Sequence, residues 1–309
     1  MAEQTRSGKR AGGAVAGEAL DAPTGNGELK APPPARRPPP LVIKPSSGWV
    51  SLGLRELWAY RELFYILVWR DVKVRYKQTA VGVIWTVLQP LAMMALFTLV
   101  FGHLLDVPSE GVPYPLFIFA ALVPWQLFAQ ALGTSAGSLV TNRDLIAKIY
   151  FPRLLVPAAP VVAAVIDLLL GLVVLGAFMA YYGVVPSLAV LALPALVLFA
   201  ILVALAAGMI LSALNVRYRD VQYAIPFLTQ FLFFATPIVY SVEIFPEPWR
   251  TLVGLNPVAG VVEGFRWALF DPAGGFEPLI GVSVGVTVLL LVAGLAYFRR
   301  AERTFADEV

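Results

Sequence analysis

Residues 168–216 read LLLGLVVLGAFMAYYGVVPSLAVLALPALVLFAILVALAAGMILSALNV, and this stretch contains no Asp, Glu, Lys or Arg. The same absence of charge marks four further stretches, which lie between Lys77 and Asp106, Glu110 and Arg143, Asp220 and Glu243, and Glu277 and Arg299. A helix needs about 20 mostly apolar residues to cross the hydrocarbon core of a bilayer. The sequence therefore predicts an all-α integral membrane protein.

The overall composition supports the same class. Of the 309 residues, 59% are hydrophobic and only 14% are charged, which is too little charge to cover a soluble globule of this size. The net charge of +3 comes from basic residues beside apolar spans, so nucleic-acid binding is not expected. The absence of Cys excludes disulfides and thiol catalysis, and a single His, His103, argues against metal sites built on imidazole.

Six membrane spans are predicted. The region from 114 to 140 contains two prolines and two glycines, so it is expected to be one helix, a broken helix or a helical pair. Lys and Arg concentrate in the segments on one side of the spans, which places both termini in the cytoplasm. The predicted spans, within a transmembrane domain of residues 80–300, are 80–104, 115–139, 155–182, 187–213, 223–241 and 279–298.

The two ends of the chain differ from the spans. Residues 1–46 include the run APPPARRPPP at 31–40, which cannot bury enough apolar surface to offset the ordering of the chain. We expect a disordered cytoplasmic tail there, without a cleaved signal peptide, because no apolar core of such a peptide is present. Residues 301–309 are expected to form a short cytoplasmic tail.

Residues 47–79 predict an interfacial segment built on an amphipathic helix at 52–77. Leucines and aromatic residues alternate there with a density of cations that a bilayer core excludes and a headgroup layer accepts. The alternative is a solvated helix that packs on another cytoplasmic protein. The residues singled out on this helix are Arg61, Arg70, Lys73, Arg75 and Tyr76.

Motifs of catalysis are missing from the chain. It has no G-x-x-x-x-G-K-[ST] loop for phosphates, no H-E-x-x-H, no G-x-S-x-G and no glycine-rich dinucleotide fingerprint. The chain alone is therefore not expected to hydrolyse ATP or to hold a cofactor. Transport, a channel, membrane anchoring and a receptor remain as functions.

The loop after the second predicted span carries a short amphipathic pattern. Thr141 or Asn142 is placed to cap a short helix, and Pro152 is placed to end it. The apolar stripe of this helix consists of Leu145, Ile146 and Ile149. Such a helix either docks on a partner or ends a span at the headgroups.

Charged residues near the other spans mark two more candidates. Arg217 and Arg219 are expected to anchor the end of the fourth span at the headgroups, with Asp220 as their partner. Asp167 lies about halfway along a span, where an ionised group is costly and must face the bundle interior, a partner subunit or water. We favour a structural hydrogen-bond anchor over a substrate contact for Asp167.

The segment 242–278 lies on the opposite side of the membrane from most of the basic residues. Asn256 followed by Pro257 is a signal for the start of a helix, and the apolar stripe after it is too short to span. We predict a re-entrant or interfacial helix in which Glu263 and Arg266 pair at i, i+3. Such a hairpin would cap a pore from outside.

Five separated motifs in this order carry a resemblance to a known family. They are LRELWAYRELFYILVWRDVKVRYKQT, GVIWTVLQPL, NRDLIAKIYFPRLLVP, LNVRYRDV and LNPVAGVVEGFRWALF. The chain resembles, over about residues 48–305, the permease subunits of type-2 ABC exporters, and within them the branch that exports lipid-linked O-antigen, capsule or teichoic acid. The Pro-rich tail lies outside the resemblance.

The resemblance implies a homodimer of six-span subunits in the bacterial inner membrane, joined to two copies of a separate ATPase that holds ATP and Mg. It also implies a coupling helix at 142–152, and its candidate residues are Asn142, Arg143, Leu145, Ile146, Lys148, Ile149, Tyr150, Phe151 and Arg153. Aromatic residues near the pathway are candidates for stacking on sugar rings, although each one singly fits a packing or lipid-facing role better; they are Trp85, Phe97, Phe101, Phe231, Phe234 and Tyr240.

Three other functions compete with this reading. An ion-coupled secondary transporter would need charged groups at the membrane midplane, for which Asp167 is the one clear candidate. A passive channel or membrane scaffold leaves the coupling-like loop unexplained. A type-2 ABC permease for a small hydrophobic substrate would have the same fold but would not transport a glycan.

Overall fold

The computed structural model describes residues 54–77, 82–186, 188–246, 249–270 and 278–302. All of them belong to one compact unit, Gly48–Val309. The predicted tail at 1–46 lies outside the described residues, as does most of the predicted C-terminal tail. Within the described part every regular element is a helix and no strand occurs, so the predicted all-α class is confirmed.

Five helices are long and apolar enough to cross a membrane. They coincide within a few residues with five of the predicted spans, because crossing the hydrocarbon core takes a helix of about 20 mostly apolar residues. These helices are α3 (Gly82–Phe97) continued by the π-helical η1 (Thr98–Leu104), α4 (Tyr114–Thr141), α6 (Leu155–Tyr182), α7 (Leu193–Arg217) preceded by η2 (Leu188–Ala192), and α11 (Pro278–Glu302).

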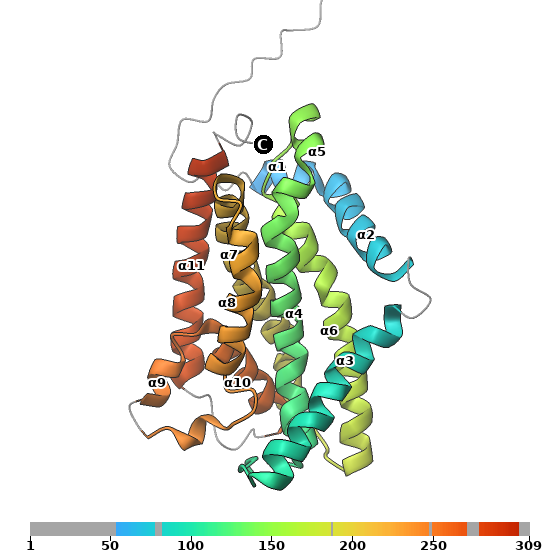
Figure 1. The fold of residues 1–309 in the computed structure, drawn as a ribbon, viewed down its shortest axis with the longest axis vertical. Coiled ribbons are helices and arrows are strands. Elements are labelled where there is room, and N and C mark those ends of the chain that lie inside the picture. Colours follow the sequence, from blue (N-terminus) through green and yellow to red (C-terminus); the bar gives the residue numbers. More distant parts are fainter. Residues whose placement is uncertain (1–53, 78–81, 187, 247–248, 271–277, 303–309) are drawn as a thin grey trace, which may run out of the picture. The chain divides into compact units, whose positions relative to one another are not determined.

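The span predicted at 223–241 takes a different form. Its helix, α8 (Val221–Ala235), has only 15 residues. At about 1.5 Å per residue it covers roughly 22 Å of a hydrocarbon core that is about 30 Å thick. An irregular segment, residues 236–241, continues from it toward the end of the bundle where α9 and α10 lie (Figure 1). The count of six crossings therefore stays a prediction.

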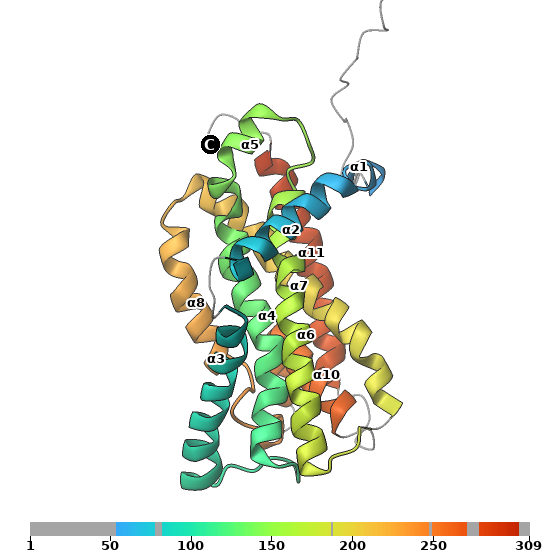
Figure 2. The same cartoon turned by 90° about the vertical axis from the view of Figure 1, so that its right-hand side faces the viewer.

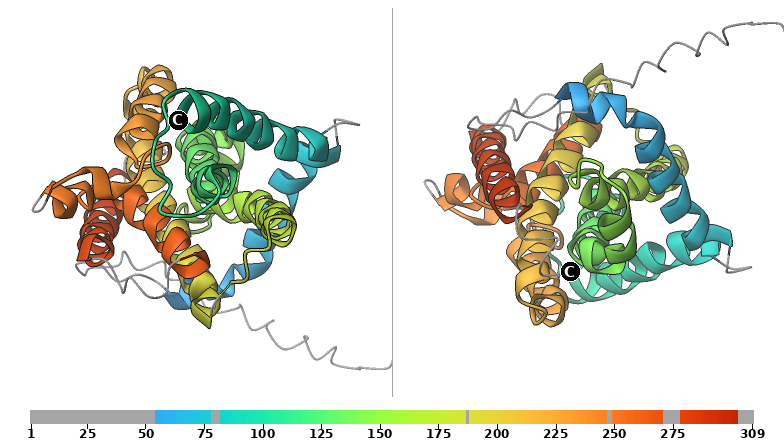
Figure 3. Two further views of the ribbon diagram at one scale, coloured as in Figure 1. Left: turned by 90° about the horizontal axis from the view of Figure 1, so that it is seen from below. Right: turned by 90° about the horizontal axis from the view of Figure 1, so that it is seen from above.

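Helix α4 lies at the centre of the bundle. Seen along the long axis, it is surrounded by α3, α6, α7 and α8 (Figure 3). Of the residues in its most apolar 18-residue stretch, 78% are buried. Of the alternatives left open for this region, the structure shows one continuous helix that passes through Pro124. Helix α4 packs tightly on α7 at Gly208, where any larger side chain on α7 would collide with Ser135 of α4.

Short helices cover the two ends of the bundle (Figure 1). At one end, here called the α5 end, are α1 (Leu54–Ala59), α2 (Arg61–Lys77) and α5 (Arg143–Lys148). At the other, the α10 end, are η3 (Val242–Ile244), α9 (Trp249–Val253) and α10 (Pro257–Leu269). The predicted helix at 52–77 is thus divided into two.

Helix α2 crosses α6 obliquely (Figure 2) and packs one of its faces on its own bundle. Leu67 on that face is buried in a cluster with Ile146 and Phe298. The opposite face exposes Ile66 and Trp69 among the cations. An exposed face that is both apolar and basic suits a headgroup layer, whereas the face turned to the bundle is already covered.

Candidate functional site

The charge within the third span, Asp167, is buried between α2, α4 and α6. Its carboxylate accepts hydrogen bonds from the guanidinium of Arg75 and the hydroxyl of Tyr76, both in the last turn of α2. The amide of Gln130 on α4, oriented by this network, donates to Asp167 at 2.8 Å and accepts from Arg75 Nε at 3.3 Å. Asp167 therefore ties the end of α2 to the interior of the bundle.

Tyr76 contributes a permanent donor to this cluster. Burial, together with the hydrogen bond to Asp167 and the charge of that carboxylate, raises the pKa of Tyr76 to about 12. Its hydroxyl consequently stays protonated at neutral pH. The cluster, defined as Arg75, Tyr76, Gln130 and Asp167, is called the anchor cluster below.

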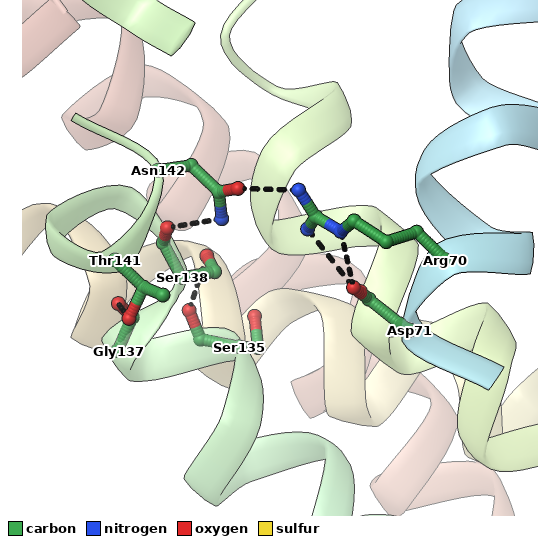
Figure 4. A network of polar contacts seen from close by, with 7 residues as sticks. All are labelled: Arg70, Asp71, Ser135, Gly137, Ser138, Thr141 and Asn142. Atoms are coloured by element: carbon green, nitrogen blue, oxygen red, sulfur yellow. Dashed lines mark hydrogen bonds and ion pairs between the residues drawn. The ribbon is translucent and has the colours of Figure 1, made fainter. Parts of the chain in front are cut away.

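A second polar network lies nearer the α5 end (Figure 4). Arg70 Nη1 on α2 donates to Asn142 Oδ1 at 2.7 Å, across 72 positions of the chain. Arg70 Nε and Nη2 donate to the neighbouring Asp71 at 3.1 and 2.9 Å. The amide of Asn142 in turn donates to the carbonyl of Ser138 at 2.8 Å.

This network corrects the predicted start of α5. Asn142 is the residue that precedes the helix, but neither its side chain nor that of Thr141 caps α5, because both are bonded to the last turn of α4. The predicted stop is also wrong: α5 ends at Lys148, where Ile149 turns extended, before Pro152 is reached. α5 is therefore a single short turn at the tip of α4.

The predicted apolar stripe of α5 is divided between two directions. Ile146 is buried and Leu145 is half-buried in the cluster at the α5 end, together with the buried Phe151. Ile149 and Tyr150 are 52% and 80% exposed. The inward residues fix the loop to the bundle, and the outward pair forms an apolar tip, called the tip below.

The cations around α5 also divide. Arg143 and Lys148 are exposed beside the tip. Arg153 instead binds the end of α11, since its Nη1 donates to the carbonyl of Glu302 at 2.6 Å and its backbone N–H to the carboxylate of the same residue at 3.3 Å. Arg153 therefore links the loop after α5 to the end of α11.

At the end of α7 the structure differs from the expectation. Arg217, Arg219 and Asp220 are all exposed, and the guanidinium of Arg217 lies 5.4 Å from the ring centre of Tyr218. No ion pair joins Asp220 to either arginine in the part of the chain that the structure describes. The expected Asp220 partnership is therefore wrong, and all three side chains are exposed at the end of α7 instead of paired with one another.

The short helix at the α10 end forms as its residues predict. Asn256 Oδ1 accepts from the backbone N–H of Val258 at 3.1 Å, and Pro257 occupies the first position of α10. The amide of Asn256 also donates to Thr236 Oγ1 at 2.9 Å. Glu263 and Arg266 pair at 2.8 Å with i, i+3 spacing.

Arg266 has a role that spacing does not reveal. It is 2% exposed, and its two terminal nitrogens donate to the carbonyls of Pro237 at 2.7 Å and Ile238 at 2.9 Å. Tyr114 on α4 binds the next carbonyl, that of Val239, at 2.7 Å. Irregular backbone at membrane depth is tolerated only where protein groups satisfy it. Arg266 and Tyr114 therefore hold the segment that replaces the end of the predicted fifth span.

An open cavity of about 550 Å³ lies between α3, α4 and α8. Three glutamine side chains and a threonine line it, namely Gln89, Gln126, Thr229 and Gln230. Aromatic rings form another part of the wall, where Phe233 stacks on Phe97 at 5.7 Å between ring centres and meets Trp125 edge-on at 5.4 Å. We call this space the amide cavity.

Two of the predicted aromatic candidates, Phe97 and Phe234, line the amide cavity. Phe101 packs on Phe97 behind it, and Tyr240 donates to the carbonyl of Phe234 at 3.1 Å. The remaining two, Trp85 and Phe231, are 60% and 61% exposed on the outer faces of α3 and α8. The sequence analysis missed the three glutamines, although amides inside charge-free stretches are a signal that could have found them.

A second open cavity, of about 730 Å³, lies between α2 and α4 at the α5 end. Arg70 and Arg75 form part of one wall and Ser138 and Asn142 part of the other. Gly133 lines this cavity and the amide cavity alike. The two spaces are therefore neighbours on α4, with Gly133 at the border of each.

Residues 62–270 match the ABC-2 type transporter family. The chain belongs to this family. The O-antigen export system permease protein RfbA of Myxococcus xanthus is 32% identical over 260 residues, which are 83% of this chain and 98% of that protein. RfbA of Klebsiella pneumoniae is 28% identical over 247 residues, 80% of this chain and 94% of that one. The polysialic acid transport protein KpsM of Escherichia coli is 22% identical over 240 residues, with coverage of 75% and 91%.

Membership of the ABC-2 type transporters confirms the family that the five motifs predict. The matched residues run from the start of α2 to the end of α10, so they contain both cavities, the anchor cluster and the tip. As an ABC-2 type transporter the chain is a multi-pass membrane permease. In its described residues no group of three or more metal-ligating side chains comes together.

Proposed function

We propose that this chain is the membrane-spanning permease of an ATP-driven exporter that moves a lipid-linked polysaccharide of the O-antigen, capsule or teichoic acid type. Two copies of the chain form the path, and each binds one copy of a separate ATPase that holds ATP and Mg. The chain lies in the bacterial inner membrane, with both termini and α5 in the cytoplasm, so that the glycan leaves toward the α10 end.

The amide cavity is the observation that carries this proposal. Sugars present hydroxyl groups that bond to amides and apolar C–H faces that pack on aromatic rings. The wall of the cavity offers both, with Gln126 and Gln230 beside Trp125 and Phe233. A small hydrophobic substrate in this cavity would cover the three amides without offering them hydrogen-bond partners, and burying an unpaired amide is costly.

The tip is the proposed contact with the ATPase. Ile149 and Tyr150 project from a loop that Ile146 and Phe151 fix to the bundle. An exposed apolar pair on a rigid support suits a docking pocket, since a few buried side chains carry most of the affinity of an interface. Arg143 and Lys148 provide cations at its edge.

An ion-coupled secondary transporter is the second candidate function, and it would require Asp167 as its coupling carboxylate. A coupling carboxylate must exchange protons or ions with the path. Asp167 is instead held by Arg75, Tyr76 and Gln130 and lines neither of the two cavities described above. These contacts favour the ATP-driven exporter.

The proposed substrate is tested by reconstituting the permease with its ATPase and measuring ATP hydrolysis stimulated by lipid-linked glycan. In a Gln126→Leu and Gln230→Leu double variant we expect the half-maximal glycan concentration to rise about tenfold, because a lost hydrogen bond costs about 0.5–1.5 kcal/mol. Thr287→Val on α11, outside both cavities, is the control. Unchanged stimulation in a correctly assembled double variant would contradict the substrate assignment.

The proposed docking contact is tested by co-purification. Replacing Ile149 and Tyr150 by Asp should abolish association with the ATPase and leave membrane insertion intact, because neither side chain supports the bundle. Lys148→Ala, at the rim of the same loop, should change association little. Normal association of the double Asp variant would show that the ATPase binds elsewhere.

A further inference from the structure

The bond between Arg70 and Asn142 joins the two walls of the cavity at the α5 end. Arg70 belongs to the wall formed by α2, and Asn142 ends the wall formed by α4. Figure 4 shows the guanidinium reaching from α2 across to the amide. Its position makes this contact a determinant of how closely α2 approaches α4.

The α4 side of this contact is rigid. Behind the Asn142 amide, Ser138 Oγ donates to the carbonyl of Ser135 at 2.6 Å, and Ser135 Oγ donates to the carbonyl of Pro157 on α6 at 2.8 Å. All of these groups are satisfied, and a satisfied buried network fixes its members. A change in the contact must therefore come from α2 or from α5, which begins directly after Asn142.

The two polar attachments of α2 differ in how readily they can be released. At the anchor cluster the side chains of Arg75 and Asp167 are 18% and 5% exposed, so separating them would strand a buried charge. At Arg70 the side chain is 44% exposed and keeps Asp71, while Asn142 is neutral. Separation there strands no charge. Of the two polar attachments of α2, the Arg70 contact is therefore the easier to release.

We propose that the Arg70–Asn142 bond is a latch that holds α2 near the end of α4 and limits the width of the open cavity between them, and that displacement of α5 releases it. The second half rests on the proposed function, in which an ATPase moves α5. With the anchor cluster and the packing of Leu67 on the bundle retained, release lets the Arg70 side of α2 move away from the end of α4. Because Gly133 borders both this cavity and the amide cavity, widening the first brings the polar part of a substrate next to the second.

The absence of cysteine in the chain makes the latch testable by thiol labelling of the whole permease. Ser138→Cys is the reporter, since Ser138 lines the cavity and is 4% exposed. Ser212→Cys on α7, 0% exposed and outside both cavities, reports general loosening. Arg70→Ala and Asn142→Ala should each raise the labelling rate of the reporter about tenfold and leave the control slow.

Conservative variants separate a latch from a general structural role. Arg70→Lys keeps the charge but lacks the planar fork whose separate nitrogens bind Asp71 and Asn142 in two directions, so labelling should be fast. Asn142→Asp keeps an acceptor for Arg70, so labelling should stay slow. A reporter that stays protected in Arg70→Ala and Asn142→Ala overturns the proposal, and so does an equal rise in the Ser212→Cys control.

The role of α5 has its own readout. Adding the ATPase with ATP should raise labelling of Ser138→Cys in the otherwise unaltered chain. Slow labelling under these conditions, with Arg70→Ala still fast, would refute release by α5 and retain the latch. Failure of the proposed docking contact is a different result, because it appears as normal ATPase association in the variants of Ile149 and Tyr150.

Discussion

Replacing Arg75 alone, as in Arg75→Met, should destabilise the bundle more than replacing both members of its ion pair, Arg75 and Asp167. Methionine retains the aliphatic stem of the arginine, so packing changes little. Asp167, however, keeps a charge at a site where its side chain is 5% exposed. Only the Tyr76 hydroxyl and the Gln130 amide then remain to bind that carboxylate.

The contacts set the size of the effect. Removing one partner of a buried ion pair costs about 3–5 kcal/mol, and the surviving donors place Arg75→Met near 3 kcal/mol. Asp167→Leu leaves Arg75 unpaired and should cost a similar amount. The double variant leaves no charge, and it removes the acceptor of the two hydrogen bonds from Tyr76 and Gln130, at about 1 kcal/mol each. We therefore expect about 2 kcal/mol for the pair instead of the sum of about 6 kcal/mol.

Thermal unfolding of the purified permease in one detergent provides the measurement. For a chain of this length about 1 kcal/mol shifts the Tm by roughly 3 °C, so each single variant should lose about 9 °C and the double variant about 6 °C. Arg61→Met is the control, since Arg61 is exposed on the same helix and should lose little. Additive losses in the double variant would refute the argument that Arg75 and Asp167 neutralise each other.

Three further predictions concern topology, transport and pH. With both termini in the cytoplasm, a cysteine replacing Ala147 should resist impermeant thiol reagents in intact cells and one replacing Trp249 should react; labelling at 147 from outside would overturn this orientation. Asp167→Asn keeps an acceptor for the anchor cluster, so export should largely survive; complete loss with normal folding and ATPase activity would indicate ion coupling instead. Because the pKa of Tyr76 is raised from 10.0 to about 12, the folded state holds its proton more tightly than the unfolded chain, and stability should fall as pH rises from 10 toward 12. The fall should be smaller in Tyr76→Phe, and equal pH profiles would count against that pKa.

The parts of the fold that follow from chain-local physics are recovered from the sequence. The helix α6 has the same bounds as the span predicted at 155–182, because a long and almost wholly apolar stretch in lipid has no alternative to a helix. The start of α10 at Pro257 and the Glu263–Arg266 pair also depend only on neighbours within one turn. Each of these features is decided by residues close together in the chain.

The early end of α8 illustrates what local pattern misses. Residues 236–241 are as free of charge as a span should be. The helix nevertheless stops at Ala235, and the carbonyls beyond it are bound by Arg266 and Tyr114, residues 29 and 125 positions away from their partners. Without those distant donors irregular backbone would be too costly at this depth, so the outcome depends on the tertiary structure.

The candidate sites divide in the same way. The sequence singled out Asp167 as a costly charge and 142–152 as a short amphipathic loop, and neither inference needed the fold. The partner of Asp167 lies 92 positions away and that of Asn142 lies 72 away, so only the folded chain could bring these residues together. The tertiary structure also decided that Ile146 faces the bundle while Ile149 faces outward.

The sequence by itself determined that this is an integral membrane protein, how long most of its helices are, and to which family it belongs. The tertiary structure decided which faces meet and therefore where the cavities and the latch lie. The reason is that the bilayer acts as the solvent: lipid-facing and protein-facing side chains are equally apolar, so hydropathy fixes the length of a span without revealing its orientation. Only packing distinguishes the two faces of such a helix.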